Sequence, residues 1–181
     1  ELELDLLDED AKESKLEDLT ESLGSKSIEI DPYQQLRIAA QFTREGKFDQ
    51  AEGVYTDQIR RFEILRDVKG AAFAQKELGY LHMLKGDFTQ ALESHQTAKS
   101  LFEGISDHFL VDSVNHQIGN CLYYLNRDEE ANQIFRNCVE FSLEYGDYSN
   151  IYTAQYMVSV YALANGDDTR GKYLLDGCIK A

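Results

Sequence analysis

The chain has 181 residues, 43% of them hydrophobic, and a single proline, which suits a nearly all-helical domain with a sizeable core. Its net charge of −15 argues against DNA, RNA or an anionic membrane surface as the main partner. The sequence has no apolar span of ~20 residues and no signal peptide pattern. We therefore expect a cytoplasmic protein without membrane contact, and, because the chain begins with Glu1 rather than Met, a fragment or processed form.

Residues 1–31 differ from the rest, because they carry twelve acidic and three basic residues, a net charge of −9. Leu16, Leu19 and Leu23 follow the i, i+3, i+7 spacing of a narrow apolar stripe on a helix. Residues 24–27 have the composition of a linker. One interpretation is a solvated acidic leader or the end of an upstream domain. The other is a segment that docks on its own repeat array or on a neighbouring molecule.

The pair Asp31-Pro32 is a helix start signal, an N-cap followed by proline at the first helical position. From there the pattern predicts four pairs of helices, and the second helix of the last pair is short. The expected ranges are 33–45 and 48–66, 68–85 and 88–103, 108–125 and 128–145, and 148–165 and 168–181.

The four pairs repeat with a period of 40 residues. Gly or Asn at the turn inside each pair accepts the left-handed conformation that ends a helix. Asp before the first helix of a pair is a good N-cap. Small residues on both helices allow their backbones to approach closely. The turn series is Gly46, Gly86, Asn126 and Gly166; the cap series is Asp67, Asp107 and Asp147; the small-residue series are Ala39, Gly79, Gly119, Ser159 and Ala51, Ala91, Ala131, Gly171.

This pattern resembles the tetratricopeptide repeat family over residues 32–181. The residues that carry the resemblance are Leu78-Gly79, Ile118-Gly119, Gly86, Ala91 and Ala98. The common unit has ~34 residues, so the longer unit here is similar to the subgroup found in bacterial peptide-sensing regulators and eukaryotic polarity scaffolds. The sequence departs from the family pattern in having no Trp and in replacing the inter-repeat Pro with Asp.

The resemblance implies an all-α, right-handed solenoid of four antiparallel helix pairs behind the acidic leader. The expected repeats are 32–66, 67–106, 107–146 and 147–181, and residues 1–31 form the leader, partly helical or disordered. In this family the first helices of the pairs line a concave groove. Aromatic anchors there, with Lys, Arg, His and Asn between them, suit an extended peptide. The groove candidates are Arg44, Phe73, Lys76, Tyr80, Met83, His116, Asn120, Tyr123, Tyr124 and Tyr156; alternatively, about half of them belong to the core or are crowded by neighbours.

Nothing in the sequence points to catalysis, a cofactor or a metal. No Gly-rich phosphate loop follows a strand, and the four histidines lack metal-ligand spacing. His82 and His95 occupy repeat positions filled elsewhere by apolar residues, so we expect them to pack in the core. We expect the same of Cys121, Cys138 and Cys178.

The leading hypothesis is a non-catalytic module that binds a peptide or helix of a partner protein in its groove. A second hypothesis is self-assembly into a homo-oligomer through the leader or the last helix. A third is the sensor part of a peptide-responsive regulator.

Overall fold

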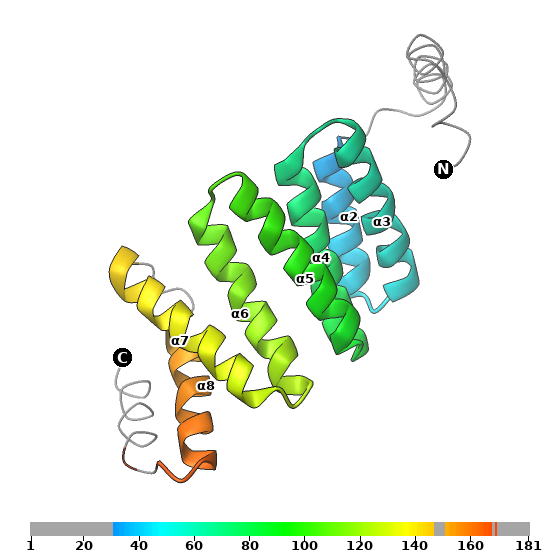
Figure 1. Cartoon of the computed structure of the whole chain (residues 1–181). Coiled ribbons are helices and arrows are strands. Elements are labelled where there is room, and N and C mark those ends of the chain that lie inside the picture. Colours follow the sequence, from blue (N-terminus) through cyan, green and yellow to red (C-terminus); the bar gives the residue numbers. More distant parts are fainter. Residues whose placement is uncertain (1–30, 147–150, 168, 170–181) are drawn as a thin grey trace, which may run out of the picture.

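The computed structural model describes residues 31–146, 151–167 and 169, and this part of the chain forms seven helices (Figure 1). The expectations for the leader, for the Asp147 cap and for the helix after residue 167 lie outside these residues. The helices are α2 (Pro32–Arg44), α3 (Phe48–Ile64), α4 (Val68–Lys85), α5 (Phe88–Gly104), α6 (His108–Tyr124), α7 (Asp128–Tyr145) and α8 (Ile151–Ala164).

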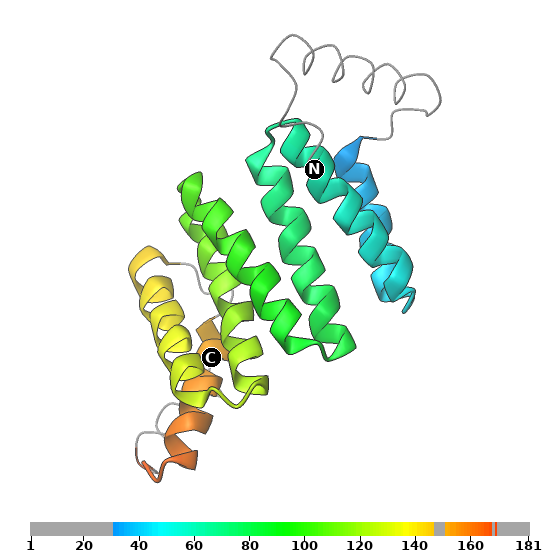
Figure 2. The ribbon, with the colours of Figure 1, turned by 45° about the vertical axis from the view of Figure 1, so that its right-hand side comes forward.

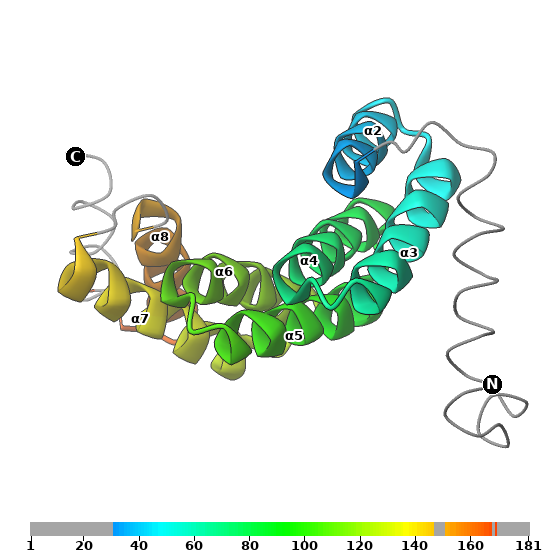
Figure 3. The same cartoon turned by 90° about the horizontal axis from the view of Figure 1, so that it is seen from above.

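The helices stack as antiparallel neighbours along an arc, which confirms the predicted all-α solenoid (Figure 2). Each helix packs against the next one in the chain, and α4 also contacts both α2 and α6. Seen along the stack, α2, α4, α6 and α8 form the inner side of the arc and α3, α5 and α7 the outer side (Figure 3). The first helix of each predicted pair is therefore an inner helix.

Every turn is closed by a residue in the left-handed conformation, and these residues recur every 20 positions. The N–H of the next residue donates to a carbonyl five residues back, at 2.9–3.1 Å in six of the turns. This bond satisfies a carbonyl that the helix end would leave unpaired. The residues are Gly46, Arg66, Gly86, Ser106, Asn126, Gly146 and Gly166, with φ between 53° and 82°. The four predicted turns are confirmed, and the sequence interpretation missed 66, 106 and 146.

Aspartate caps begin the inner helices α2, α4 and α6 as predicted. Asp67 Oδ1 accepts from the Gly70 N–H at 2.8 Å, and Asp107 Oδ1 accepts from the Leu110 N–H at 3.3 Å. Asp31 does the same for α2 at 3.2 Å. These caps fix where each inner helix starts and so set the common edge from which all of them run.

Small residues let the two helices of a repeat approach, and a large ring fills the space opposite. A Cβ on Gly79 would lie 2.7 Å from the His95 ring, and one on Gly119 would lie 2.8 Å from the Phe135 ring. In the first repeat, Ala39 is the fully buried counterpart. The close approach predicted for these positions is therefore confirmed, and it explains why bulkier residues do not occur there.

The buried side chains form two clusters. One lies between α2, α3 and α4, and the other extends from α4 to α8. The half-buried Phe73 and Leu101 pack against both. Cys121 and Cys138 are buried in the second cluster as free thiols, as expected, whereas Cys178 lies outside the described residues.

Replacing Gly119 with Ala will destabilise the protein by ~1–3 kcal/mol, because the new methyl group meets the buried Phe135 ring. The matched control is Gly53→Ala in the interior of α3, where an added Cβ meets nothing within 4 Å. This control will stabilise by ~0.5–1 kcal/mol through helix propensity. Urea unfolding of both variants measures the difference. Equal effects of the two substitutions would contradict the packing described above.

Candidate functional site

The inner helices expose a row of tyrosines. Tyr80 on α4, Tyr123 and Tyr124 on α6 and Tyr156 on α8 are between 42% and 56% exposed. Apart from their last turns, the outer helices expose no large hydrophobic side chain in the described part of the chain. The inner side is therefore the broad surface with aromatic side chains available for contact.

Charge is divided between the two layers in the same way. The inner helices carry five basic and two acidic residues, a net charge of +3. The outer helices carry four basic and eleven acidic residues, a net charge of −7. One of the two inner carboxylates, Asp112, is buried. Basic residues thus outnumber acidic ones on the inner helices of a strongly acidic protein, and three of them, Lys69, Lys76 and Lys85, are ion-paired.

Of the four candidates on α4, Phe73, Lys76 and Met83 are half-buried and only Tyr80 is exposed. The Phe73 ring meets the core ring of Phe102 edge to face, with centroids 5.4 Å apart. The Lys76 Nζ lies 5.8 Å from the Phe73 centroid and 3.5 Å from Glu77 Oε1. Met83 is half-buried against the core, whereas Tyr80 is exposed. Tyr80 and Lys76 are accordingly the groups of α4 that a ligand would meet first.

On α6, His116 is a core residue and not an exposed donor. Its side chain is only 5% exposed, and its ring meets the Phe135 ring edge to face at 5.5 Å. Its Nδ1 lies 3.5 Å from the Nδ2 of Asn120, the predicted amide contact, which is half-buried. Burial lowers the pKa of His116, so the ring stays neutral near pH 7. The structure therefore places His116 behind Asn120.

Tyr123 and Tyr124 form an aromatic pair at the end of α6. Their ring centroids are 5.7 Å apart, and Tyr124 also stacks on Phe88 of α5 at 4.6 Å with an interplanar angle of 10°. These contacts hold both rings while leaving them accessible. The remaining candidates, Arg44 and Tyr156, are exposed on the flanking helices α2 and α8, so the candidate set extends along the whole inner side.

A partly enclosed hollow lies where α6, α7 and α8 meet. Tyr123 lines it together with Phe135, Met157 and Tyr161, so its lining is mainly apolar. The sequence interpretation missed Met157 and Tyr161. Their helix was recognised, but the interpretation took only selected positions of each first helix as inward-facing.

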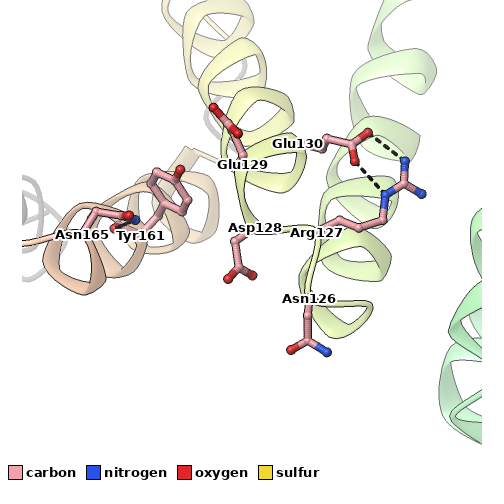
Figure 4. Close-up of a pocket in the computed structure, with 7 residues that line it drawn as sticks. All are labelled: Asn126, Arg127, Asp128, Glu129, Glu130, Tyr161 and Asn165. Carbon is pink, nitrogen blue, oxygen red and sulfur yellow. Dashed lines mark hydrogen bonds and ion pairs between the residues drawn. The ribbon is translucent and has the colours of Figure 1, made fainter.

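A second hollow at the α6–α7 turn is polar (Figure 4). Arg127 donates two hydrogen bonds to Glu130, both of 2.7 Å, and Figure 4 shows Asp128 and Glu129 pointing away from this pair. The arginine is thus already neutralised, and the rest of the lining is acidic or uncharged. In the described residues, no group of three or more His, Cys, Asp or Glu side chains could hold a metal ion.

His95 of α5 is buried between the inner and outer helices, and burial lowers its pKa. It is fully buried, and neither ring nitrogen has a hydrogen-bond partner. Burial, with smaller contributions from Lys76 and His82, lowers its pKa to about 4. The ring therefore packs as a neutral aromatic side chain, like Phe135 at the equivalent position. Similarly, burial raises the pKa of the Cys121 thiol to about 12, so this thiol is not a nucleophile near neutral pH.

Comparison with known proteins places the repeats in context. Residues 70–144 match the model of the tetratricopeptide repeat family. No curated protein sequence matches the chain significantly. No helix in the described residues is long and apolar enough to cross a membrane.

Three crystal structures share the fold at 14% sequence identity. The repeats of a protein named as a kinesin light chain from Podosopora anserina have a TM-score of 0.70, with 94% of this chain and 87% of that chain covered. BtubC from P. vanneervenii has a TM-score of 0.74, with 86% and 66% covered. A signal transduction ATPase with a tetratricopeptide repeat sensor from Pyrococcus horikoshii has a TM-score of 0.71, with 94% and 26% covered. At this identity the likeness concerns the fold alone.

The buried His95 makes stability depend on pH. The pKa of a solvated histidine, as in the unfolded chain, is 6.5, whereas that of His95 in the folded protein is about 4. Between these pH values the unfolded chain therefore binds more protons than the folded one. Stability will fall as the pH drops from 6.5 to 4, by up to about 3 kcal/mol from this residue. His95→Phe, which copies Phe135, will remove that part of the loss in urea unfolding at pH 7.5 and 4.5. An unchanged pH dependence in the variant would contradict this assignment.

Proposed function

We propose that this tetratricopeptide-repeat-like protein binds a peptide segment of a partner protein on the inner side of its arc. Repeats of this family typically mediate protein–protein interactions. The observation that carries the proposal is the coincidence of two properties on one surface: the half-exposed tyrosines and the net charge of +3 of the inner helices. Tetratricopeptide repeats, the family model that matches residues 70–144, are commonly non-catalytic scaffolds, and the role we infer is non-catalytic.

The side chains define what such a segment should contain. Tyrosines offer large apolar area with a hydroxyl group at low entropic cost, so they suit apolar anchors on the ligand. Arg44 and Lys76 favour carboxylates, and at Lys76 a carboxylate of the ligand would replace or join that of Glu77. Asn120 can pair with a peptide backbone. We therefore infer a segment that combines acidic and apolar residues.

Two other roles stay predictions. Self-assembly through the leader or the last helix concerns residues outside the described part of the chain. A sensor role would require an effector domain elsewhere in a longer protein. Neither is favoured by a contact or a surface of the described residues.

Selection of random twelve-residue peptides against the full chain tests the proposal. We expect enriched peptides to carry Asp or Glu together with apolar residues. Changing both Tyr80 and Tyr123 to Ala will weaken their binding by about 30-fold or more, the size expected for loss of a hot spot. Lys76→Glu will weaken acidic peptides selectively, and this loss will be smaller at high salt. Fluorescence anisotropy of labelled peptides gives the affinities.

The matched control is Tyr145→Ala. This tyrosine is 52% exposed, as the inner tyrosines are, but it ends the outer helix α7. The control will bind the selected peptides as the unchanged protein does. If the inner double variant binds them equally well while remaining folded, peptide binding on the inner side is wrong.

A further inference from the structure

A second exposed apolar surface follows one edge of the solenoid. It lies at the junctions where each outer helix ends and the next inner helix begins, and these junctions share one edge (Figure 1). Three of its residues recur every 40 positions, so it is a regular feature of the repeat and not a set of scattered side chains. We call it the apolar rim: Leu65, Val68, Ile105, Phe109, Leu143 and Tyr145, between 37% and 61% exposed.

Side-chain contacts hold this edge together from one repeat to the next. The Tyr33 hydroxyl donates to Asp67 Oδ2 at 2.7 Å, and Lys69 Nζ donates to Asp107 Oδ2 at 3.2 Å. The Phe109 ring at the second junction lies 6.2 Å from the Tyr145 ring at the third. The rim is therefore fixed on a continuous support and is preorganised for contact.

The acidic leader is attached at this same edge. Asp31 caps α2 at the position that Asp67 and Asp107 hold in the next repeats, and the Tyr33–Asp67 bond joins this point to the first junction. Eight positions separate Leu23 from Asp31, a reach of up to about 26 Å. Successive junctions are about 20 Å apart, since packed helices lie 8–10 Å from one another. Leu23 can therefore reach the first junction, and residues 16–23, which span about 10 Å as a helix, extend from there toward the second.

Charge and hydrophobicity match as well. The first junction is flanked by the exposed Arg60 and Arg66, with Glu63 between them, and by Lys69, which is already paired with Asp107. Within the described part of the chain, no carboxylate forms an ion pair with Arg60 or Arg66. The leader carries a net charge of −9 and the leucine stripe of residues 16–23. A segment that is both acidic and leucine-bearing complements the two arginines and the aliphatic side chains of the first junction.

We propose that residues 16–23 of the leader dock on the apolar rim of their own chain, across Leu65, Val68, Ile105 and Phe109. The leucine stripe covers these side chains, and carboxylates of the leader lie beside Arg60 and Arg66. The leader thereby extends the core at the edge and leaves the inner side free. This interaction is separate from peptide binding by the tyrosines, and either one can hold without the other.

The absence of Trp from the chain provides the test. In the full chain, Leu19→Trp introduces a single tryptophan whose emission reports burial of the stripe. We expect blue-shifted emission that returns to that of solvated Trp when Leu65 and Phe109 are both changed to Ser. The control, Tyr80→Ser with Tyr156→Ser, removes two tyrosines of similar exposure from the inner side and will leave the emission blue-shifted. Circular dichroism establishes that each variant is folded.

Hydrogen exchange on the chain without the tryptophan gives an independent readout. Amides of residues 16–23 will exchange at least tenfold more slowly than in the variant with Ser at positions 65 and 109. Because this chain keeps Leu19, the measurement is free of any effect of the introduced tryptophan on docking. Exchange equally fast in both proteins would overturn the proposal, as would emission that responds to the inner-side control instead. Protection that grows with protein concentration would assign the rim to the leader of a second copy and equally overturn docking within one chain.

Discussion

The hydrogen bond that closes each helix determines the architecture. A left-handed residue turns the chain, and the following N–H reaches a carbonyl five residues back, as in the bond from Asp87 to His82. Because this closure recurs every 20 residues, successive helices run antiparallel with nearly equal length. A one-residue insertion in a helix would rotate everything beyond it by about 100° about the helix axis. The division into inner and outer layers, and hence the exposed tyrosine row, depends on this constant spacing.

The two layers separate chemistry as well as position. The outer layer holds most of the helical acidic charge and, in the described residues, exposes large apolar side chains only in the last turns of its helices. The inner layer combines basic and aromatic side chains, while the tight packing of Gly79 on His95 and of Gly119 on Phe135 locks it to the outer layer. Two exposed apolar surfaces remain, one on the inner helices and one at the junctions. The repeat therefore presents two different surfaces from one set of helices.

The helix caps at Asp67 and Asp107 and the close approach at Gly79 and Gly119 were predictable from the sequence, because each depends on the identity of one side chain. Features that depend on how neighbouring repeats pack were not predictable from the sequence. His116 occupies an inward position by counting, yet its ring packs against Phe135, because the twist between adjacent helices decides which side of a helix is covered. Likewise, Arg66 carries no sign of its left-handed conformation, which the closing hydrogen bond imposes.

The two buried clusters have a consequence for cooperativity. Helix α4 belongs to both, because Ala71, Ala74 and Leu81 pack in the first cluster and Ala72 in the second, while the half-buried Phe73 and Leu101 pack against both. In repeat arrays, stability is close to a sum of local terms and interface terms, and a weak interface divides the array into separately opening units. Here the two clusters are joined by α4 itself, the helix that bears Lys76 and Tyr80. A molecule held against α4 would therefore stabilise both clusters at once.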